Sequence, residues 1–356
     1  MNKKMHAFFA LFFIFVLFDS LLAQNCPSCF NGSRISAVIQ KYKIPETGHF
    51  SMITDLNGFE EFYLGTDYAE PYIVTNPLDP LNSVCLFTNS VYVTIDGCNW
   101  RKTGTVNVDP FVCFDAAGIV YHTRLNGGNL TILKSTNKGL NWLSPTTIYI
   151  GLPDKWSIIA DKTSGPYSNT LYAIWQEWQT TTRLLRISRS TNGGSNWNTP
   201  VKVNTGNQAY CPWIALGPNG SIDGGSVYYA FNTFESNSDT IRVVVRRSTN
   251  SGVSFLPEYI ADSFKHPGEI CNNQQQKIKN CIDVNACVQI AADNSNGPAR
   301  GNVYLVYTVN PVGTDKADIR FTKSTNFGVS WSPSIKLNDD NTTADQWLPS
   351  ISVDVN

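Results

Sequence analysis

Aromatic, carboxylate and guanidinium side chains recur in the loops between the strands predicted below, and this is the mixture of groups that binds a sugar. The apolar faces of a sugar ring stack on indole rings, while its hydroxyl groups need charged or polar partners. The candidate binding residues of this kind are His122, Arg124, Asp154, Trp156, Trp178, Arg183, Arg242, Asp345 and Trp347. If their loops converge on one concave surface, we expect that surface to bind carbohydrate.

The same loops contain groups that could hydrolyse a glycosidic bond, a reaction that uses a pair of carboxyl groups. Glu177, Glu235 and Asp239 are the candidate acid and base, and Tyr210 is a more distant candidate nucleophile. A loop carboxylate is equally often only solvated, and a tryptophan such as Trp178 can pack between sheets instead of facing a ligand. Hydrolysis and non-catalytic binding therefore remain as two hypotheses.

An eight-residue motif, repeated four times, indicates what positions these loops. It reads STNKGLNW, STNGGSNW, STNSGVSF and STNFGVSW, and a degenerate copy, VTIDGCNW, ends at Trp100. The asparagine can bond backbone N–H groups two residues on, the glycine tolerates a positive φ, and the closing aromatic ring packs the turn onto its own sheet. The residues assigned to these turns are Ser135, Asn137, Gly139 and Trp142; Ser190, Asn192, Gly194 and Trp197; Ser248, Asn250, Gly252 and Phe255; and Ser324, Asn326, Gly328 and Trp331.

A second repeated pattern, a short apolar run that ends at a turn-forming residue, is typical of a strand buried on both faces. Its six copies are 70–76, 109–115, 155–161, 211–217, 287–293 and 348–354. Since three further strands follow most copies, the sequence predicts an all-β fold, a six-bladed β-propeller with four-stranded antiparallel blades. The sixth blade is incomplete, so we expect the hairpin within 50–64, with Asn57-Gly58 at its turn, to close it. The sequence reads as C-terminally truncated.

The eight-residue motif resembles the Asp box, or BNR repeat, of the sialidase superfamily, with asparagine where aspartate is commoner. The resemblance implies a propeller that acts on or binds glycans, with the boxes as structural turns away from the site. Catalytic sialidases clasp their substrate with three arginines, for which Arg124, Arg183 and Arg242 are the candidates here. They also have a Phe/Tyr-Arg-Ile-Pro motif, whose nearest match in this sequence is Arg34-Ile35-Ser36. The resemblance leaves exo-glycosidase activity and binding of glycans, cell-surface proteins or matrix proteins as alternatives.

The N-terminus has the pattern of a secretory signal peptide over residues 1–23, with a basic start and an apolar run. We expect a short segment over 24–49 and a single propeller domain over 50–356, in a secreted or cell-surface monomer without a transmembrane anchor. The net charge of −1 gives no reason to expect nucleic acid as a partner. Neither a cofactor nor a metal site is predicted.

Nine cysteines follow the predicted cleavage site, so we expect several disulfides and at least one unpaired thiol. Cys26 and Cys29 are close enough in sequence to pair, and Cys271 and Cys281 could close an insertion. Cys211 and Cys287 occupy the same position in neighbouring repeats and could bridge them. A zinc site at Cys26 and Cys29 would need a second pair of ligands, which the sequence does not show.

Overall fold

The computed structural model describes residues 7–9, 49–50, 52–54, 60–62 and 64. It then describes residues 71–353 except 88, 108, 180, 207, 235–238, 272–274, 279–281, 312 and 341. The chain divides into two compact units. Unit 1 comprises Met1–Ala10 and Ile148–Asn356, and unit 2 comprises Leu11–Thr147. The described residues are all-β, and among them no helix is long or apolar enough to cross a membrane.

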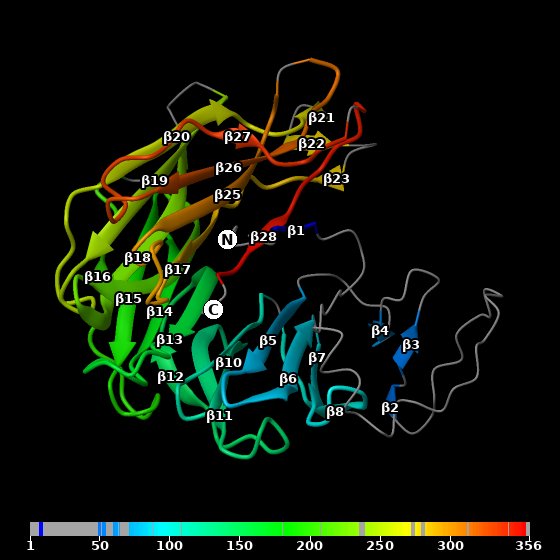
Figure 1. Cartoon of the computed structure of the whole chain (residues 1–356), viewed down its shortest axis with the longest axis vertical. Helices are drawn as coiled ribbons and strands as arrows, with labels where there is room; N and C mark the ends of the chain where they lie inside the picture. Colours follow the sequence, from blue (N-terminus) through cyan, green and yellow to red (C-terminus); the bar gives the residue numbers. More distant parts are fainter. Residues whose placement is uncertain are drawn as a thin grey trace. The chain divides into compact units, whose positions relative to one another are not determined.

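Unit 2 contains two antiparallel sheets, each built from four consecutive strands (Figure 1). The first contains β5 (Tyr72–Asn76), β6 (Asp79–Phe87), β7 (Ser90–Thr94) and β8 (Trp100–Gly104), and β2 (His49–Phe50) adds to its edge. The second contains β9 (Phe111–Phe114), β10 (Val120–Asn126), β11 (Asn129–Ser135) and β12 (Thr146–Tyr149), whose last two residues are assigned to unit 1. Valines and aromatic residues from both sheets share one buried cluster.

Unit 1 contains three more sheets of the same design. The first is formed by β13 (Pro153–Ala160), β14 (Leu171–Trp178), β15 (Arg183–Ser190) and β16 (Val201–Lys202). The second is formed by β17 (Tyr210–Asn219), β18 (Ile222–Phe234), β19 (Thr240–Ser248) and β20 (Tyr259–Lys265). The third is formed by β24 (Gln289–Ala292), β25 (Val303–Val309), β26 (Asp318–Ser324) and β27 (Ile335–Lys336). An inserted three-stranded sheet of β21 (Glu269–Cys271), β22 (Gln275–Ile278) and β23 (Ile282–Asp283) precedes the third.

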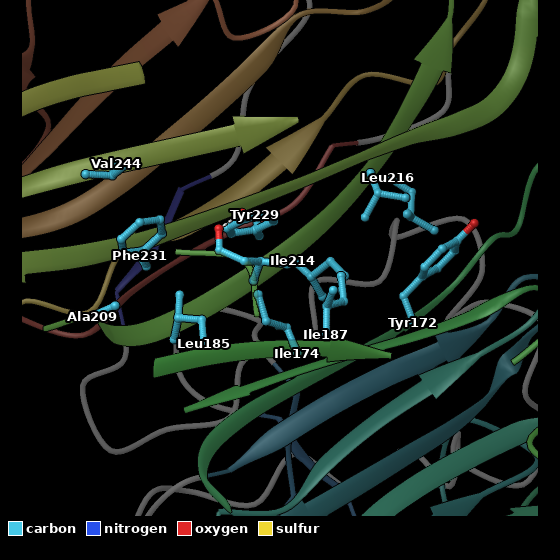
Figure 2. Close-up of a cluster of buried hydrophobic side chains, with 12 residues drawn as sticks. Tyr172, Ile174, Leu185, Ile187, Ala209, Ile214, Leu216, Tyr229, Phe231 and Val244 are labelled. Atoms are coloured by element: carbon cyan, nitrogen blue, oxygen red, sulfur yellow. Dashed lines mark hydrogen bonds between the residues drawn. The ribbon is translucent and has the colours of Figure 1, made fainter. Parts of the chain in front are cut away.

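The middle sheet of unit 1 is buried on both faces, which explains its continuous apolar strands. Along β18, Val227, Tyr229 and Phe231 face a cluster shared with the preceding sheet, drawn in Figure 2. Tyr228 and Ala230, the residues between them, face a second cluster shared with the following sheet. Alternate residues of one strand thus fill two cores, as successive blades of a propeller require.

The predicted six-bladed ring is wrong in its count, because the described residues form five four-stranded blades. All six predicted inner strands exist, but the sixth, β28 (Pro349–Ile351), pairs only with β1 (Ala7–Phe9) among the described strands. The repeated pattern marks the first strand of a blade, so counting it overestimates the number of blades by one. Since β1 lies inside the predicted signal peptide, cleavage of that peptide would remove the partner of β28.

The N-terminal hairpin also departs from the prediction. Its two strands, β3 (Met52–Thr54) and β4 (Glu60–Phe62), pair with each other, and the predicted turn residues Asn57 and Gly58 lie outside the described residues. They form a separate two-stranded sheet and do not pair with β28. The hairpin therefore does not close a sixth blade.

The four boxes share one hydrogen-bond pattern, which the box that begins at Ser248 illustrates. The Ser248 hydroxyl donates to Asn250 Oδ1 at 2.9 Å and accepts the Gly252 N–H at 2.9 Å. Asn250 Oδ1 also accepts the N–H of Ser254 at 2.9 Å. The asparagine thus reaches a backbone N–H four residues on, where the sequence predicted two. In the degenerate copy, Asp96 Oδ1 accepts the N–H groups of Cys98 and Asn99, which lie two and three residues on.

Three boxes also contact the preceding blade of their own unit through the residue between asparagine and glycine, and this residue has a positive φ in all three. In unit 1, the carbonyl oxygen of Ser251 (φ 57°) accepts a hydrogen bond from Arg189 Nη1 at 2.6 Å. Phe327 (φ 61°) places the centre of its ring 4.6 Å from the Arg247 guanidinium. In unit 2, Lys138 (φ 64°) pairs with Asp79 at 2.7 Å. The boxes therefore fasten blades together as well as closing turns.

The predicted disulfide between Cys211 and Cys287 is present, with an S–S distance of 2.04 Å. It joins the start of β17 to the residues just before β24, and so links the inner strands of two neighbouring blades. Cys85 is a buried free thiol on β6, and burial raises its pKa to about 12. Cys26, Cys29, Cys281 and the side chain of Cys271 lie outside the described residues.

Replacing Ser248 by alanine should destabilise the fold by about 2 kcal/mol, because the half-buried Gly252 N–H and Asn250 Oδ1 each lose a hydrogen-bond partner. Ser254→Ala is the matched control, since that exposed hydroxyl accepts only from Asn250 Nδ2, and it should change stability by less than about 0.5 kcal/mol. Urea unfolding of both variants measures the difference. Equal losses would show that the buried serine does not stabilise the box.

Candidate functional site

One group of the predicted site residues comes together in unit 1, where β14, β15 and β17 begin or end. Trp178 is the last residue of β14, Arg183 is the first of β15, and the two are paired in register. Tyr210 is the first residue of β17, and Asp154 is the second of β13. We call Asp154, Trp178, Arg183 and Tyr210 the platform.

The platform is built around the Arg183 guanidinium, which lies between two aromatic rings. Its central carbon is 3.9 Å from the centre of the Trp178 ring and 4.4 Å from that of Tyr210. Its Nη1 donates to the Tyr210 hydroxyl, while its Nε is buried without a hydrogen-bond partner among the described residues. A guanidinium held between two π faces is fixed in direction, and its charge is stabilised by both rings.

Trp178 is held in place although 44% of its surface is exposed. The indole N–H donates to Asp154 Oδ2 at 2.6 Å, and the same carboxylate oxygen accepts a bond from Gln176 Nε2 at 3.3 Å. The Trp178 backbone N–H bonds to the Leu152 carbonyl at 3.4 Å. With Arg183 on the ring as well, an aromatic surface faces solvent in a single orientation.

Backbone geometry at the start of the inner strands positions the other two platform residues. Lys155 and Cys211, which follow Asp154 and Tyr210, have φ angles of 42° and 48°, in a region that residues other than glycine rarely adopt. The pairing register shifts at both places, between Asp154 and Ser157 and between Tyr210 and Trp213. These bulges redirect the strand beside the platform, a common arrangement next to functional sites.

The row of rings continues beyond the platform to Phe234, which the sequence argument did not single out, and then to His266. Phe234, the last residue of β18, lies 4.5 Å from the Tyr210 ring and 5.7 Å from that of His266. Gln208 accepts a bond from the Tyr210 hydroxyl at 3.2 Å. Phe234 ends the second strand of its blade as Trp178 ends that of the preceding blade. Alignment of the blades with each other would therefore have found it.

The candidate catalytic carboxylates are bound in ion pairs or hydrogen bonds where the structure describes them. Glu177 bonds to Arg186 Nε at 2.6 Å and accepts from Gln179 at 3.1 Å. Burial tends to raise its pKa, but the bonds from Gln179, Arg186 and Tyr149 together hold it below its ordinary value. Asp239 is half-exposed and lies 3.5 Å from Lys265 Nζ, and Glu235 lies outside the described residues.

The pKa of one further predicted loop carboxyl group, Asp315, is shifted in the opposite direction. Asp315 is the one described carboxyl whose pKa is clearly raised, by burial first and then by the charges of Asp318 and Asp345. Asp345 accepts the Lys316 backbone N–H at 3.1 Å, and Trp347 packs on a separate cluster with Ile278 and Ala317.

The remaining predicted binding residues are placed elsewhere. Trp156 is buried on β13, and Arg242 lies on β19 opposite Thr233 and Ser263. His122 and Arg124 lie on β10 in unit 2. His122 is enclosed, with its ring 4.4 Å from that of Trp142, and its Nδ1 is buried without a hydrogen-bond partner in the described part of the chain. It belongs to the packing of its own sheet.

Burial lowers the pKa of His122 to about 4, and the charge of Arg124 adds to this shift. In the unfolded chain the imidazole should have its ordinary pKa of about 6.5. The unfolded state then binds the extra proton first, so stability should fall as the pH drops from about 6.5 to 4, by up to about 3 kcal/mol. His122→Gln, which cannot be protonated in this range, should lose less stability between pH 7 and pH 4.5 than the unaltered chain. Parallel losses in urea unfolding at the two pH values would contradict the shift.

No protein-family model matches the chain, and the search of curated proteins finds no match. Among solved structures it is similar to the Hadza microbial sialidase Hz136, with a TM-score of 0.40, 12% identity, and coverage of 70% of this chain and 53% of the sialidase, about half its length. It is also similar to the Penicillium chrysogenum α-L-arabinanase complexed with arabinobiose, with a TM-score of 0.47, 13% identity, and coverage of 73% and 79%. For the Aleuria aurantia lectin AAL the values are 0.46, 10%, 76% and 78%. These TM-scores and identities are too low to indicate an activity for this chain, and the propeller assignment depends on the sheet topology itself.

Proposed function

We propose that this chain is an exported, glycan-binding β-propeller of the sialidase-like BNR type, and that the platform is its sugar-binding surface. The observation that carries the proposal is the exposed but immobilised indole of Trp178. A large aromatic ring exposed to water needs a reason, and a sugar face that stacks on it supplies one. Because three contacts already fix the ring, little conformational entropy is lost when a ligand binds.

Polar groups stand where a stacked sugar would present its hydroxyls. Asp154 retains lone pairs beyond the bond from Trp178, and Arg183 lies over the indole ring and donates to the Tyr210 hydroxyl. Gln208 adds an amide that is itself held by the Thr181 carbonyl at 2.8 Å. A few fixed polar groups around an aromatic surface give orientation and specificity in carbohydrate sites.

Binding without hydrolysis agrees best with the state of the carboxyl groups. A glycosidase needs one carboxyl group with a raised pKa to act as the acid and a second to act as base or nucleophile. Near the platform, Glu177 has a lowered pKa and is paired with Arg186, and Asp154 is bonded to Trp178. This arrangement favours a ligand that is held and released unchanged.

Export is supported by the chemistry of the cysteines and by the leader pattern. The Cys211–Cys287 bridge requires an oxidising compartment, and it lies next to Tyr210 in the platform. A leader over residues 1–23 would direct the chain to such a compartment. The two observations point to the same location.

Trp178→Ala should weaken binding to immobilised glycans by at least about tenfold, because an exposed aromatic at a binding site commonly contributes more than 1.4 kcal/mol. Val253→Ala is the control, since Val253 is 60% exposed on a box turn. Calorimetry with a glycan selected on an array measures both affinities. Equal affinities for Trp178→Ala and the unaltered chain would contradict the proposal that the platform binds glycans.

Asp154→Ala should weaken the same binding by a smaller factor, roughly threefold to tenfold, because it frees the indole without removing it. Asp154→Asn keeps an oxygen acceptor for the indole N–H and should retain most of the affinity. The thermal midpoint of each variant, read beside its affinity, separates loss of positioning from loss of fold. A defect that Asn does not rescue would assign Asp154 a different role.

The purified chain should release no chromophore from aryl glycosides of sialic acid, fucose, galactose or glucose, while it is retained on a glycan column. Steady release from any of these substrates would establish hydrolysis instead. In that case Glu177→Gln tests the role of the paired carboxylate, and unchanged turnover would remove it from the mechanism.

A further inference from the structure

Two Asn-X-Ser/Thr sequences lie within the described residues, and their asparagines differ sharply in their surroundings. They are Asn129-Leu130-Thr131 and Asn219-Gly220-Ser221. This three-residue pattern is the acceptor for N-linked glycosylation in proteins that enter a eukaryotic secretory pathway. A folded protein can keep such a glycan only where the asparagine amide points to water.

Asn129 lies at the tip of the hairpin that joins β10 to β11 (Figure 1). Asn126 and Asn129 form the last cross-strand pair, and Gly127 and Gly128 connect them with φ angles of 58° and 85°. Two consecutive positive φ angles are those of the two-residue type I′ turn. A Cβ built on either glycine would meet no atom within 4 Å, so the space around this turn is open.

The Asn129 amide has no hydrogen-bond partner in the described chain, and neither of its polar atoms is among the buried ones that lack a partner. The side chain is partly exposed, and its cross-strand neighbour Asn126 is exposed. A glycan on Nδ2 would therefore break no contact of the folded hairpin.

Asn219 is engaged at both ends of its amide. Its Nδ2 donates to the Thr249 carbonyl at 2.8 Å, and its Oδ1 accepts from Arg247 Nη2 at 3.3 Å. These bonds tie the end of β17 to the box of the same blade. A glycan on Asn219 would compete with them.

We propose that Asn129 carries an N-linked glycan and that Asn219 does not. In the transfer, a bond forms between Asn129 Nδ2 and the anomeric carbon of an oligosaccharide carried on a lipid diphosphate. The bond from that carbon to the diphosphate oxygen breaks, the lipid diphosphate leaves, and the amide loses one proton. The proposal rests on the export part of the proposed function and is independent of the platform.

The timing of the transfer follows from Thr131, the hydroxyl residue of the acceptor sequence. Thr131 is 3% exposed, and its hydroxyl donates to the Arg124 carbonyl at 3.0 Å in the folded hairpin. An enzyme that reads this hydroxyl can reach it only before the hairpin folds. The fold then decides which glycosylated chains persist, and it tolerates a glycan at Asn129 and disfavours one at Asn219.

The test is to express the full chain, with its own leader, in eukaryotic secretory cells and to collect the medium. Treatment with an amidase that removes N-glycans converts each occupied asparagine to aspartate, which peptide mass spectrometry identifies. We expect conversion at Asn129 and none at Asn219. An exported chain with Asn129 unmodified, or with Asn219 modified, would overturn the proposal.

Two variants and one further arm keep the outcomes separate. Asn129→Gln should lose the mass of one glycan with an unchanged thermal midpoint after deglycosylation, because its amide makes no hydrogen bond, whereas Asn219→Gln should leave the glycan mass unchanged. If the chain is not exported by its own leader, the export proposal fails. Residues 24–356 behind a functional host leader then still decide which asparagine is modified.

Discussion

The left-handed residue inside each box is the constraint on which the rest of the structure depends. Between asparagine and glycine, the chain must adopt a positive φ so that the buried serine can clasp both residues. That same conformation turns Ser251 and Phe327 toward Arg189 and Arg247 of the preceding blades. The positive φ that the turn requires therefore also produces a contact between neighbouring sheets. This explains why an arginine precedes the box in these two blades.

The sequence predicted the fold well at the level of the blade and poorly at the level of the ring. Box turns and inner strands depend on local backbone chemistry, so their residues could be read directly, and the bridge between Cys211 and Cys287 followed from equal positions in neighbouring repeats. The number of blades depends on which strands pair, and β28 has the pattern of an inner strand without the three partners that make a blade. The pattern encodes burial, and burial alone does not specify a hydrogen-bonding neighbour.

The candidate site was predictable in part, for a similar reason. Residue types pointed to Trp178, Arg183, Tyr210 and Asp154, and the structure brings these four together because each lies at the first or last positions of a strand. His122 has the same residue type as many site residues, yet its strand position encloses it against Trp142. Composition identifies groups that can bind a ligand, whereas the strand register decides which of them face water.

Binding and hydrolysis place opposite electrostatic demands on such a surface. Hydrolysis requires a carboxyl group that remains protonated near neutral pH, so it must be buried away from cations and hydrogen-bond donors. Glu177 is instead surrounded by Arg186, Gln179 and Tyr149, which favour its charged form. The Arg183 guanidinium lies over two rings, one of them the exposed Trp178 indole, and presents its hydrogen-bond donors in a fixed geometry. The surroundings of Glu177 and Arg183 therefore support the proposal that the described part of this surface binds a ligand without hydrolysing it.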